Sequence, residues 1–230
     1  DRPEARVLYF PKLENDEEAA YLATAIAEAE AAVKRRFPEY PLGSVRVILV
    51  FENPRAIFRI QEMAEALYPY FLGGSLGWHD FLASTARLFR HDADYRIPVK
   101  ADPDIVIRNI KESHDILVRD LAEAGALKIG GMYGILYQSG DIESFAACMV
   151  GYIRDVITQL KRGLDGFWVA HPDFVRIGIA LVEAWRQQQA DPKSTVVHDL
   201  VRALVPIESE HSALLAFIDG PDIEKLDESD

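Results

Sequence analysis

Residues 45–54 read VRVILVFENP, and the first seven of them form an almost unbroken apolar run rich in β-branched side chains. Such a run is too short to span a membrane and is typical of a strand buried on both faces, as in a parallel α/β sheet. Glu52 stands at the carboxyl end of this expected strand. Because the catalytic groups of a β/α barrel project from the carboxyl ends of its strands, Glu52 is a candidate site residue.

A second acidic residue follows one helix later. Apolar side chains in residues 55–67 recur at helical spacing, and a short strand in residues 71–78 then leads to Asp80. Glu52 and Asp80 would face one pocket, and two carboxylates suit Mg²⁺, which accepts one or two carboxylates together with substrate and water. The structural alternative pairs Glu52 with an arginine and makes Asp80 the N-cap of a helix in residues 82–89.

The amino-terminal segment predicts another strand end of the same kind. Residues 7–10, VLYF, are expected to form a strand, and Lys12 and Glu14 follow it as candidates to face the same pocket. The next helix is expected over residues 15–36, with acidic side chains in its first turn and basic side chains in its last. Its expected buried face consists of Ala19, Leu22, Ala23, Ile26, Ala29 and Val33.

The rest of the chain continues the alternation of helices and strands. The expected helices span residues 104–124, 141–162, 174–189 and 195–204, and the expected strands residues 126–136 and 166–172. This alternation predicts an α/β fold with parallel strands joined by right-handed crossovers. Five strands are three short of a closed (β/α)8 TIM barrel, which leaves an open sheet or a barrel that residues before Asp1 complete.

A polar segment, residues 91–103, interrupts the pattern between two expected helices. The basic residues beside and within it are Arg90, Arg96 and Lys100. We expect a solvated loop here, with contacts to a phosphate-bearing ligand as the alternative.

The composition is that of an acidic globular protein. The chain has 25 basic and 37 acidic side chains and a net charge of −12, which disfavours binding to nucleic acid or to an anionic membrane surface. No run of about 18 apolar residues and no signal peptide are present, so we expect a soluble cytoplasmic protein. The chain starts at Asp1 without a methionine, and one alternative is that it is a fragment of a longer protein.

A single cysteine, Cys148, excludes an internal disulfide and a cysteine-rich zinc site. It falls in the middle of an expected helix. We therefore predict a small buried side chain there and no catalytic thiol.

Five strand-end motifs together resemble the barrel of the malate synthase family. They are YFPKLEN (residues 9–15), VRVILVFENPRAIFRIQEM (45–63), GGSLGWHDFLAS (73–84), ALKIGGM (126–132) and DGFWVAHPDFV (165–175). The resemblance covers residues 7–175 and implies that the chain holds about the last five β/α units of a TIM barrel. Residues 1–190 would then be a partial barrel domain, and residues 191–230 the start of a carboxyl-terminal helical extension.

The resemblance also implies a reaction, the Mg²⁺-dependent condensation of acetyl-CoA with glyoxylate to malate and CoA. Glu52 and Asp80 fall on the magnesium ligands of the family. Glyoxylate would lie between the metal and the backbone amides of Gly77, Trp78 and His79. Asp80 is also an expected substrate-binding residue. Met132, Trp168 and Pro172 would bind substrate too, because they would lie near acetyl-CoA.

The chain also departs from the family pattern. Many members have Gly-Leu-Asn-x-Gly-Arg-Trp-Asp-Tyr where residues 73–81 read Gly-Gly-Ser-Leu-Gly-Trp-His-Asp-Phe. The transition-state arginine and the general-base aspartate of the family are not found in the chain, so its catalytic residues are unassigned and we expect the isolated chain to be inactive. The alternatives are a citrate lyase β-subunit-like or malyl-CoA lyase-type enzyme and a non-catalytic barrel domain.

Overall fold

The computed structural model describes residues 6–94 and 103–220, with the backbone alone for 103–110. The chain divides into two compact units, residues 1–131 and 132–230. The predicted boundary at residue 190, between a partial barrel domain and a carboxyl-terminal helical extension, comes from the family resemblance. It stays a prediction.

Five strands form one sheet in the order in which they occur in the chain. They are β1 (Val7–Phe10), β2 (Arg46–Phe51), β3 (Phe71–Leu76), β4 (Leu127–Tyr133) and β5 (Gly166–Val169). The pairs β1–β2, β2–β3 and β3–β4 are parallel. This arrangement confirms the predicted α/β fold of parallel strands joined by helical crossovers.

Strand β2 is the centre of the first unit. All residues from Val47 to Phe51 are buried, as the apolar run predicts. Its neighbour β3 approaches closely, because Gly74 would carry a Cβ only 2.5 Å from the Phe51 ring. Glycine at that position therefore lets the Phe51 ring pack directly against the β3 backbone.

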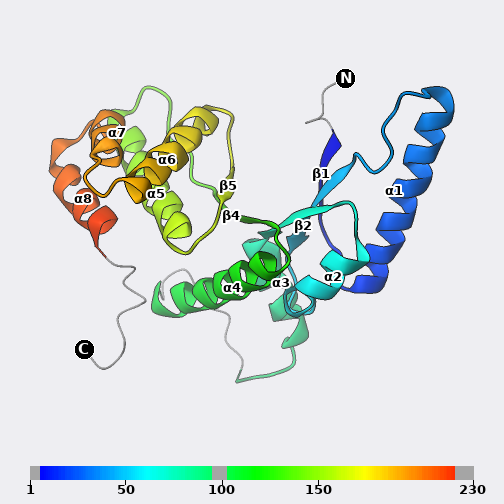
Figure 1. Ribbon diagram of the computed structural model, residues 1–230. Helices are drawn as coiled ribbons and strands as arrows, with labels where there is room; N and C mark the ends of the chain where they lie inside the picture. Colours follow the sequence, from blue (N-terminus) through cyan, green and yellow to red (C-terminus); the bar gives the residue numbers. More distant parts are fainter. Residues whose placement is uncertain (1–5, 95–102, 221–230) are drawn as a thin grey trace. The chain divides into compact units, whose positions relative to one another are not determined.

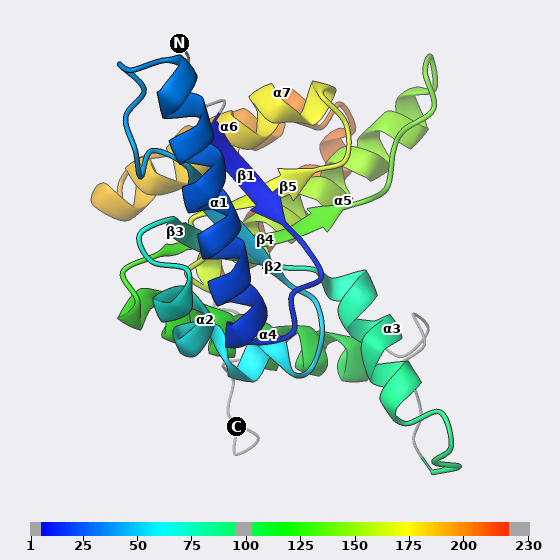
Figure 2. The same cartoon turned by 90° about the vertical axis from the view of Figure 1, so that its right-hand side faces the viewer.

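Helix α1 (Asp16–Arg36) runs beside β1 and β2 (Figures 1 and 2). Asn15 caps it by accepting a hydrogen bond from the Glu18 amide at 2.9 Å. The predicted buried face is wrong at two positions, because Ala29 and Val33 are exposed and Glu30 is buried instead. The loop that leads into β2 supplies the reason, since it places backbone N–H groups around the Glu30 carboxylate.

The single helix expected over residues 55–67 is in fact divided. A 3₁₀ turn, η2 (Ala56–Phe58), precedes helix α2 (Ile60–Ala66), and Arg59 separates them. Asn53 fixes the tight turn that begins η2, because its Oδ1 accepts hydrogen bonds from the amides of Arg55 and Ala56. The break itself lies at Arg59, whose φ of −131° departs from the helical value. Arg59 is tied to α1 by an ion pair with Asp16 at 2.8 Å.

Two further helices complete the first unit. Helix α3 (Trp78–Leu88) follows β3, and α4 (Pro103–Glu123) precedes β4. The predicted end of α4 is confirmed, since Gly125 has the left-handed φ of 64° typical of a residue that ends a helix.

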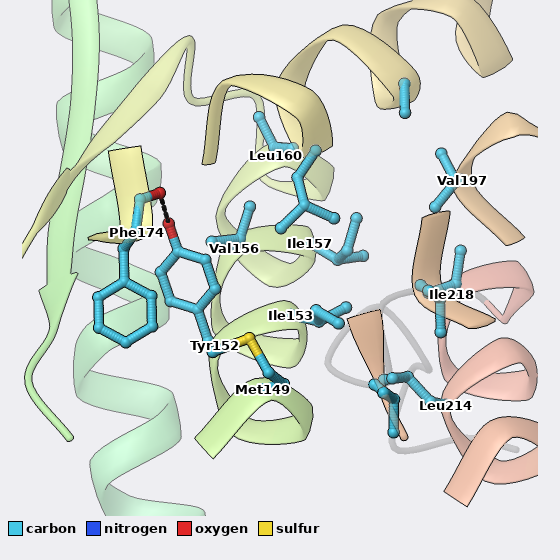
Figure 3. Packing of buried hydrophobic residues seen from close by; sticks show 14 of the residues in the cluster. Met149, Tyr152, Ile153, Val156, Ile157, Leu160, Phe174, Val197, Leu214 and Ile218 are labelled. Carbon is cyan, nitrogen blue, oxygen red and sulfur yellow. Dashed lines mark hydrogen bonds between the residues drawn. The ribbon is translucent and has the colours of Figure 1, made fainter. Parts of the chain in front are cut away.

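The second unit is built around helix α5 (Ile142–Lys161). Helices α6 (Asp173–Ala190) and α8 (His211–Asp219) pack against it, and α7 (Val196–Leu204) packs against α6 and α8. The four helices share a continuous apolar core (Figure 3), and η3 (Glu208–Glu210) precedes α8. The Tyr152 hydroxyl at the centre of this core donates to the carbonyl of Phe174 at 3.2 Å. Cys148 is buried as predicted, and this burial raises the pKa of its thiol.

Within the described ranges, no helix has the length and apolar character that crossing a bilayer requires.

Candidate active site

Glu52 lies directly after β2 and is almost fully buried, with 4% of its surface exposed. Its Oε1 accepts a hydrogen bond from the backbone amide of Lys12 at 2.8 Å. Ser84 of α3 donates to the Glu52 carbonyl at 3.4 Å. A buried carboxylate requires partners, and these contacts hold Glu52 in one place at the strand end.

Lys12 brings Glu52 and Asp80 together. Its ammonium lies 3.3 Å from Glu52 Oε1 and 2.9 Å from Asp80 Oδ2, so one cation is shared by both carboxylates. The hydrogen bond from Lys12 holds the pKa of Asp80 below its usual value, and Asp80 raises the pKa of Lys12 in turn. The three strand ends predicted to meet at one pocket therefore do meet.

Gly77 leaves the space that Glu52 fills. A Cβ at Gly77 would lie 2.6 Å from Glu52 Cβ and 2.9 Å from Val50 Cγ1. The Gly77 amide donates to the carbonyl of Phe51 at 3.0 Å, which fixes the end of β3 against the end of β2. The close approach of the two strand ends thus depends on the missing side chain.

Helix α3 begins at this point, with Gly77 before its first residue and Trp78, His79 and Asp80 in its first turn. No side chain among the described residues caps its first N–H groups. Trp78 stacks on Phe81 with ring centroids 6.0 Å apart, while His79 and Asp80 are exposed. The free amide groups and the partial positive charge of the helix start therefore favour the binding of an anion at this end of α3.

The structural alternatives for the two acids are wrong in two details, the basic partner of Glu52 and the position of Asp80 in its helix. The cation beside Glu52 is Lys12, which takes the place expected for an arginine. Asp80 lies inside the first turn of α3, because the helix starts four residues earlier than the pattern of residues 82–89 indicates. Glu14 does not join the two acids in any ion pair between described residues, and its amide donates to Glu18.

Three predicted residues belong to the second unit. Met132 lies in β4 with an exposed side chain, Trp168 lies half-buried in β5, and Pro172 directly precedes α6. His171 beside them accepts a hydrogen bond from the Asp173 amide at 3.3 Å, which fits a scaffold role for this histidine. The binding of acetyl-CoA by Met132, Trp168 and Pro172 stays a prediction.

The donor set fits a hard divalent cation that keeps open positions. Among the described residues, no group of three or more His, Cys, Asp and Glu side chains could hold a metal by itself. The site offers two carboxylates that already share one cation, the Lys12 ammonium. Mg²⁺ is commonly held by one or two carboxylates, with substrate and water in its other positions.

Comparison with known proteins identifies the family. The model of the malate synthase TIM barrel domain matches residues 1–203. Malate synthase of Oryza sativa subsp. japonica is 24% identical over 204 residues, which are 88% of this chain and 35% of that protein. Malate synthase of Streptomyces clavuligerus is 27% identical over 177 residues, which are 76% of this chain and 32% of that protein.

A solved structure of a citrate lyase from Burkholderia xenovorans LB400 has a similar fold, with a TM-score of 0.55 and 16% identity over 93% of this chain and 62% of that one. The chain spans about a third of the length of the curated relatives described above. The family model covers most of the chain, and the matched range contains Glu52, Gly77 and Asp80. The chain therefore belongs to the family of the malate synthase TIM barrel domain.

Proposed function

We propose that this chain supplies the metal-binding part of a malate synthase-type active site, in which Glu52 and Asp80 bind one Mg²⁺. The reaction would be the condensation of acetyl-CoA with glyoxylate to malate and CoA. The observation that carries the proposal is the single Lys12 ammonium shared by both carboxylates, because it marks a position where the strand ends hold a cation. A cytoplasmic location is part of the same proposal.

Each residue of the site would have a distinct task. Glu52 and Asp80 would hold the metal, which when bound supplies Lewis-acid polarisation of a carbonyl oxygen. The amides of Gly77, Trp78 and His79 would orient the carboxylate of glyoxylate at the start of α3. Met132, Trp168 and Pro172 would bind acetyl-CoA, as the resemblance implies.

A lyase of the citrate lyase β-subunit type is the second candidate, and the fold shared with the Burkholderia protein favours it. The two candidate enzymes differ in whether they form or cleave a carbon–carbon bond. Release of free thiol from acetyl-CoA and glyoxylate by the longest reading frame that contains this chain would favour the synthase. Cleavage of a 3-hydroxyacyl-CoA thioester without that release would favour the lyase.

Calorimetric titration of Mg²⁺ tests the metal site directly. Glu52→Gln and Asp80→Asn are each expected to weaken Mg²⁺ binding at least about tenfold, because each removes one anionic ligand. Glu17→Gln changes an exposed carboxylate on α1 and is the matched control. Unchanged affinity in both site variants would overturn the proposed site.

Gly77→Ala is expected to weaken Mg²⁺ binding although it removes no ligand. The new Cβ would overlap Glu52 and displace it, and overpacking of this kind costs about 1–3 kcal/mol in stability as well. Gly134→Ala is the control, since a Cβ there meets no atom within 4 Å. Equal Mg²⁺ affinity in Gly77→Ala and wild type would show that Glu52 is not held by this contact.

Lys12→Met is expected to strengthen Mg²⁺ binding by at least about fivefold, because it removes a positive charge that competes for the same two carboxylates. Titration beside a Lys193→Met control, which changes an exposed lysine of the second unit, measures the effect. A loss of affinity would mean that Lys12 instead builds the metal site.

A further inference from the structure

A cavity of about 500 Å³ lies in the first unit, beside the metal-binding residues. Its walls come from the turn after β2 and from the carboxyl-terminal half of α3 and the residues that follow it. This volume falls within the range of about 300–1,000 Å³ that small-molecule sites occupy. The proposed function does not use this cavity.

The cavity gathers positive charge in an acidic protein. Arg55, Arg87, Arg90 and His91 line it, against a single carboxylate from Glu14, while the whole chain has a net charge of −12. Among the described residues, no carboxylate forms an ion pair with any of these three arginines, although Arg59 and Arg202 elsewhere do have such partners. Three guanidinium groups around one hollow repel one another, and an anion between them would relieve that repulsion.

The wall that carries these arginines is held firmly. Asn53 accepts hydrogen bonds from the amides of Arg55 and Ala56 and donates to the carbonyl of Leu13 at 3.1 Å. Ser84, another lining residue, contacts the Glu52 carbonyl. A ligand in the cavity would therefore touch the same turn and helix that position Glu52.

Stabilisation of the helices does not explain why Arg55, Arg87 and Arg90 all line this cavity. Arg87 lies in the last turn of α3, where a cation interacts favourably with the helix dipole. Arg55 lies at the start of η2, where a positive side chain gains nothing from the dipole. Arg90 follows the end of α3 and donates through Nε to His91 Nε2 at 3.0 Å.

We propose that this cavity binds a small phosphate-bearing ligand through Arg55, Arg87 and Arg90. The planar guanidinium group presents paired N–H donors that match phosphate oxygens, and several such groups bind the charge of a phosphate more tightly than one. The open hollow accommodates the rest of a small metabolite beside the phosphate. The site is separate from the metal-binding carboxylates, so its test does not require Mg²⁺.

Calorimetric titration with pyrophosphate, in the absence of Mg²⁺, tests the proposal. Wild type is expected to bind, and Arg55→Met, Arg87→Met and Arg90→Met are each expected to bind at least about fivefold more weakly. Arg35→Met, which changes an exposed arginine on α1, is expected to bind as wild type does. Because no Mg²⁺ is present in this titration, its result does not depend on the metal site.

A second titration, with adenosine 3′,5′-bisphosphate, distinguishes a nucleotide from a free phosphate as the source of the ligand. Tighter binding of the nucleotide, with the same dependence on the three arginines, would support the proposal and identify the nucleotide. Binding of pyrophosphate alone would support a smaller phosphate metabolite. No binding of either compound, or equal binding by wild type and all three arginine variants, would overturn the proposal.

Discussion

Replacing Glu30 by alanine is expected to lower the free energy of unfolding by about 3–5 kcal/mol. Glu30 is 3% exposed in the middle of α1, and its carboxylate accepts hydrogen bonds from the amides of Gly43, Ser44 and Val45. Truncation would leave these three donors without their acceptor, and each buried donor without a partner costs about 1–3 kcal/mol. Partial access of water to the loop keeps the total below the sum.

Urea unfolding of Glu30→Ala, with Glu28→Ala as control, measures this effect. Glu28 lies on the exposed side of the same helix and is expected to change stability by less than about 0.5 kcal/mol. Equal stability of the two variants would contradict the assigned role of Glu30.

The effect of Glu30 is also expected to depend on pH. Burial alone would raise the pKa of Glu30, but the hydrogen bonds from Val45, Gly43 and Ser44 outweigh it and hold the pKa below its usual value. A carboxyl group with a lowered pKa stabilises the fold above its usual pKa, and this stabilisation is lost as the pH falls through the lower value. The difference between wild type and Glu30→Ala should therefore shrink in acid.

Replacing Asp155 by asparagine is expected to raise the free energy of unfolding by about 2 kcal/mol at pH 7. Burial in α5 raises the pKa of Asp155 to about 6, although Gln159 donates to its carboxylate at 2.7 Å and Arg162 opposes the shift. At pH 7 the folded protein must hold this group ionised in a poorly hydrated place. Asparagine removes the charge and can still accept the hydrogen bond from Gln159.

The sign of the pH dependence distinguishes this explanation from a simple packing change. A carboxyl group with a raised pKa binds its proton more tightly in the folded state, so its contribution to stability falls as the pH rises from about 4 to 6. The advantage of Asp155→Asn should therefore disappear near pH 4. Glu183→Gln, on the exposed face of α6, is the control and should show no such dependence. A constant difference across pH would contradict the charge explanation.

The sequence predicted the strands and the acidic pair because both depend on local patterns. Continuous apolar runs identify buried strands, and the residue after such a run lies at the strand end, as Glu52 does. The same reasoning placed Lys12 at the neighbouring strand end. The ion pairs of Lys12 with Glu52 and Asp80 could not be predicted. They depend on the register of three strands and on the backbone conformation at Lys12.

The misassigned positions share a physical cause, which is long-range contact. Glu30 is charged and sits among alanines, so helical spacing alone could not identify it as buried; its partners lie 13 to 15 residues further along the chain. Helix α8 was not predicted because its short apolar stretch gains its helical structure by burying Leu214 and Ile218 in the core of the second unit. Arg59, at the break between η2 and α2, is held by its ion pair with Asp16 of α1 at 2.8 Å. In each case a tertiary contact decides the local structure.

The backbone of Lys12 adopts a φ of 69°, the only positive value among the described residues other than glycine. A side chain with a Cβ is strained in this left-handed conformation, and glycine would adopt it without cost. The lysine is nevertheless the residue whose amide and ammonium both reach Glu52. At this position, then, the stability of the turn and the needs of the site oppose each other, because glycine would relieve the strain and keep the amide but would lose the ammonium that both carboxylates share.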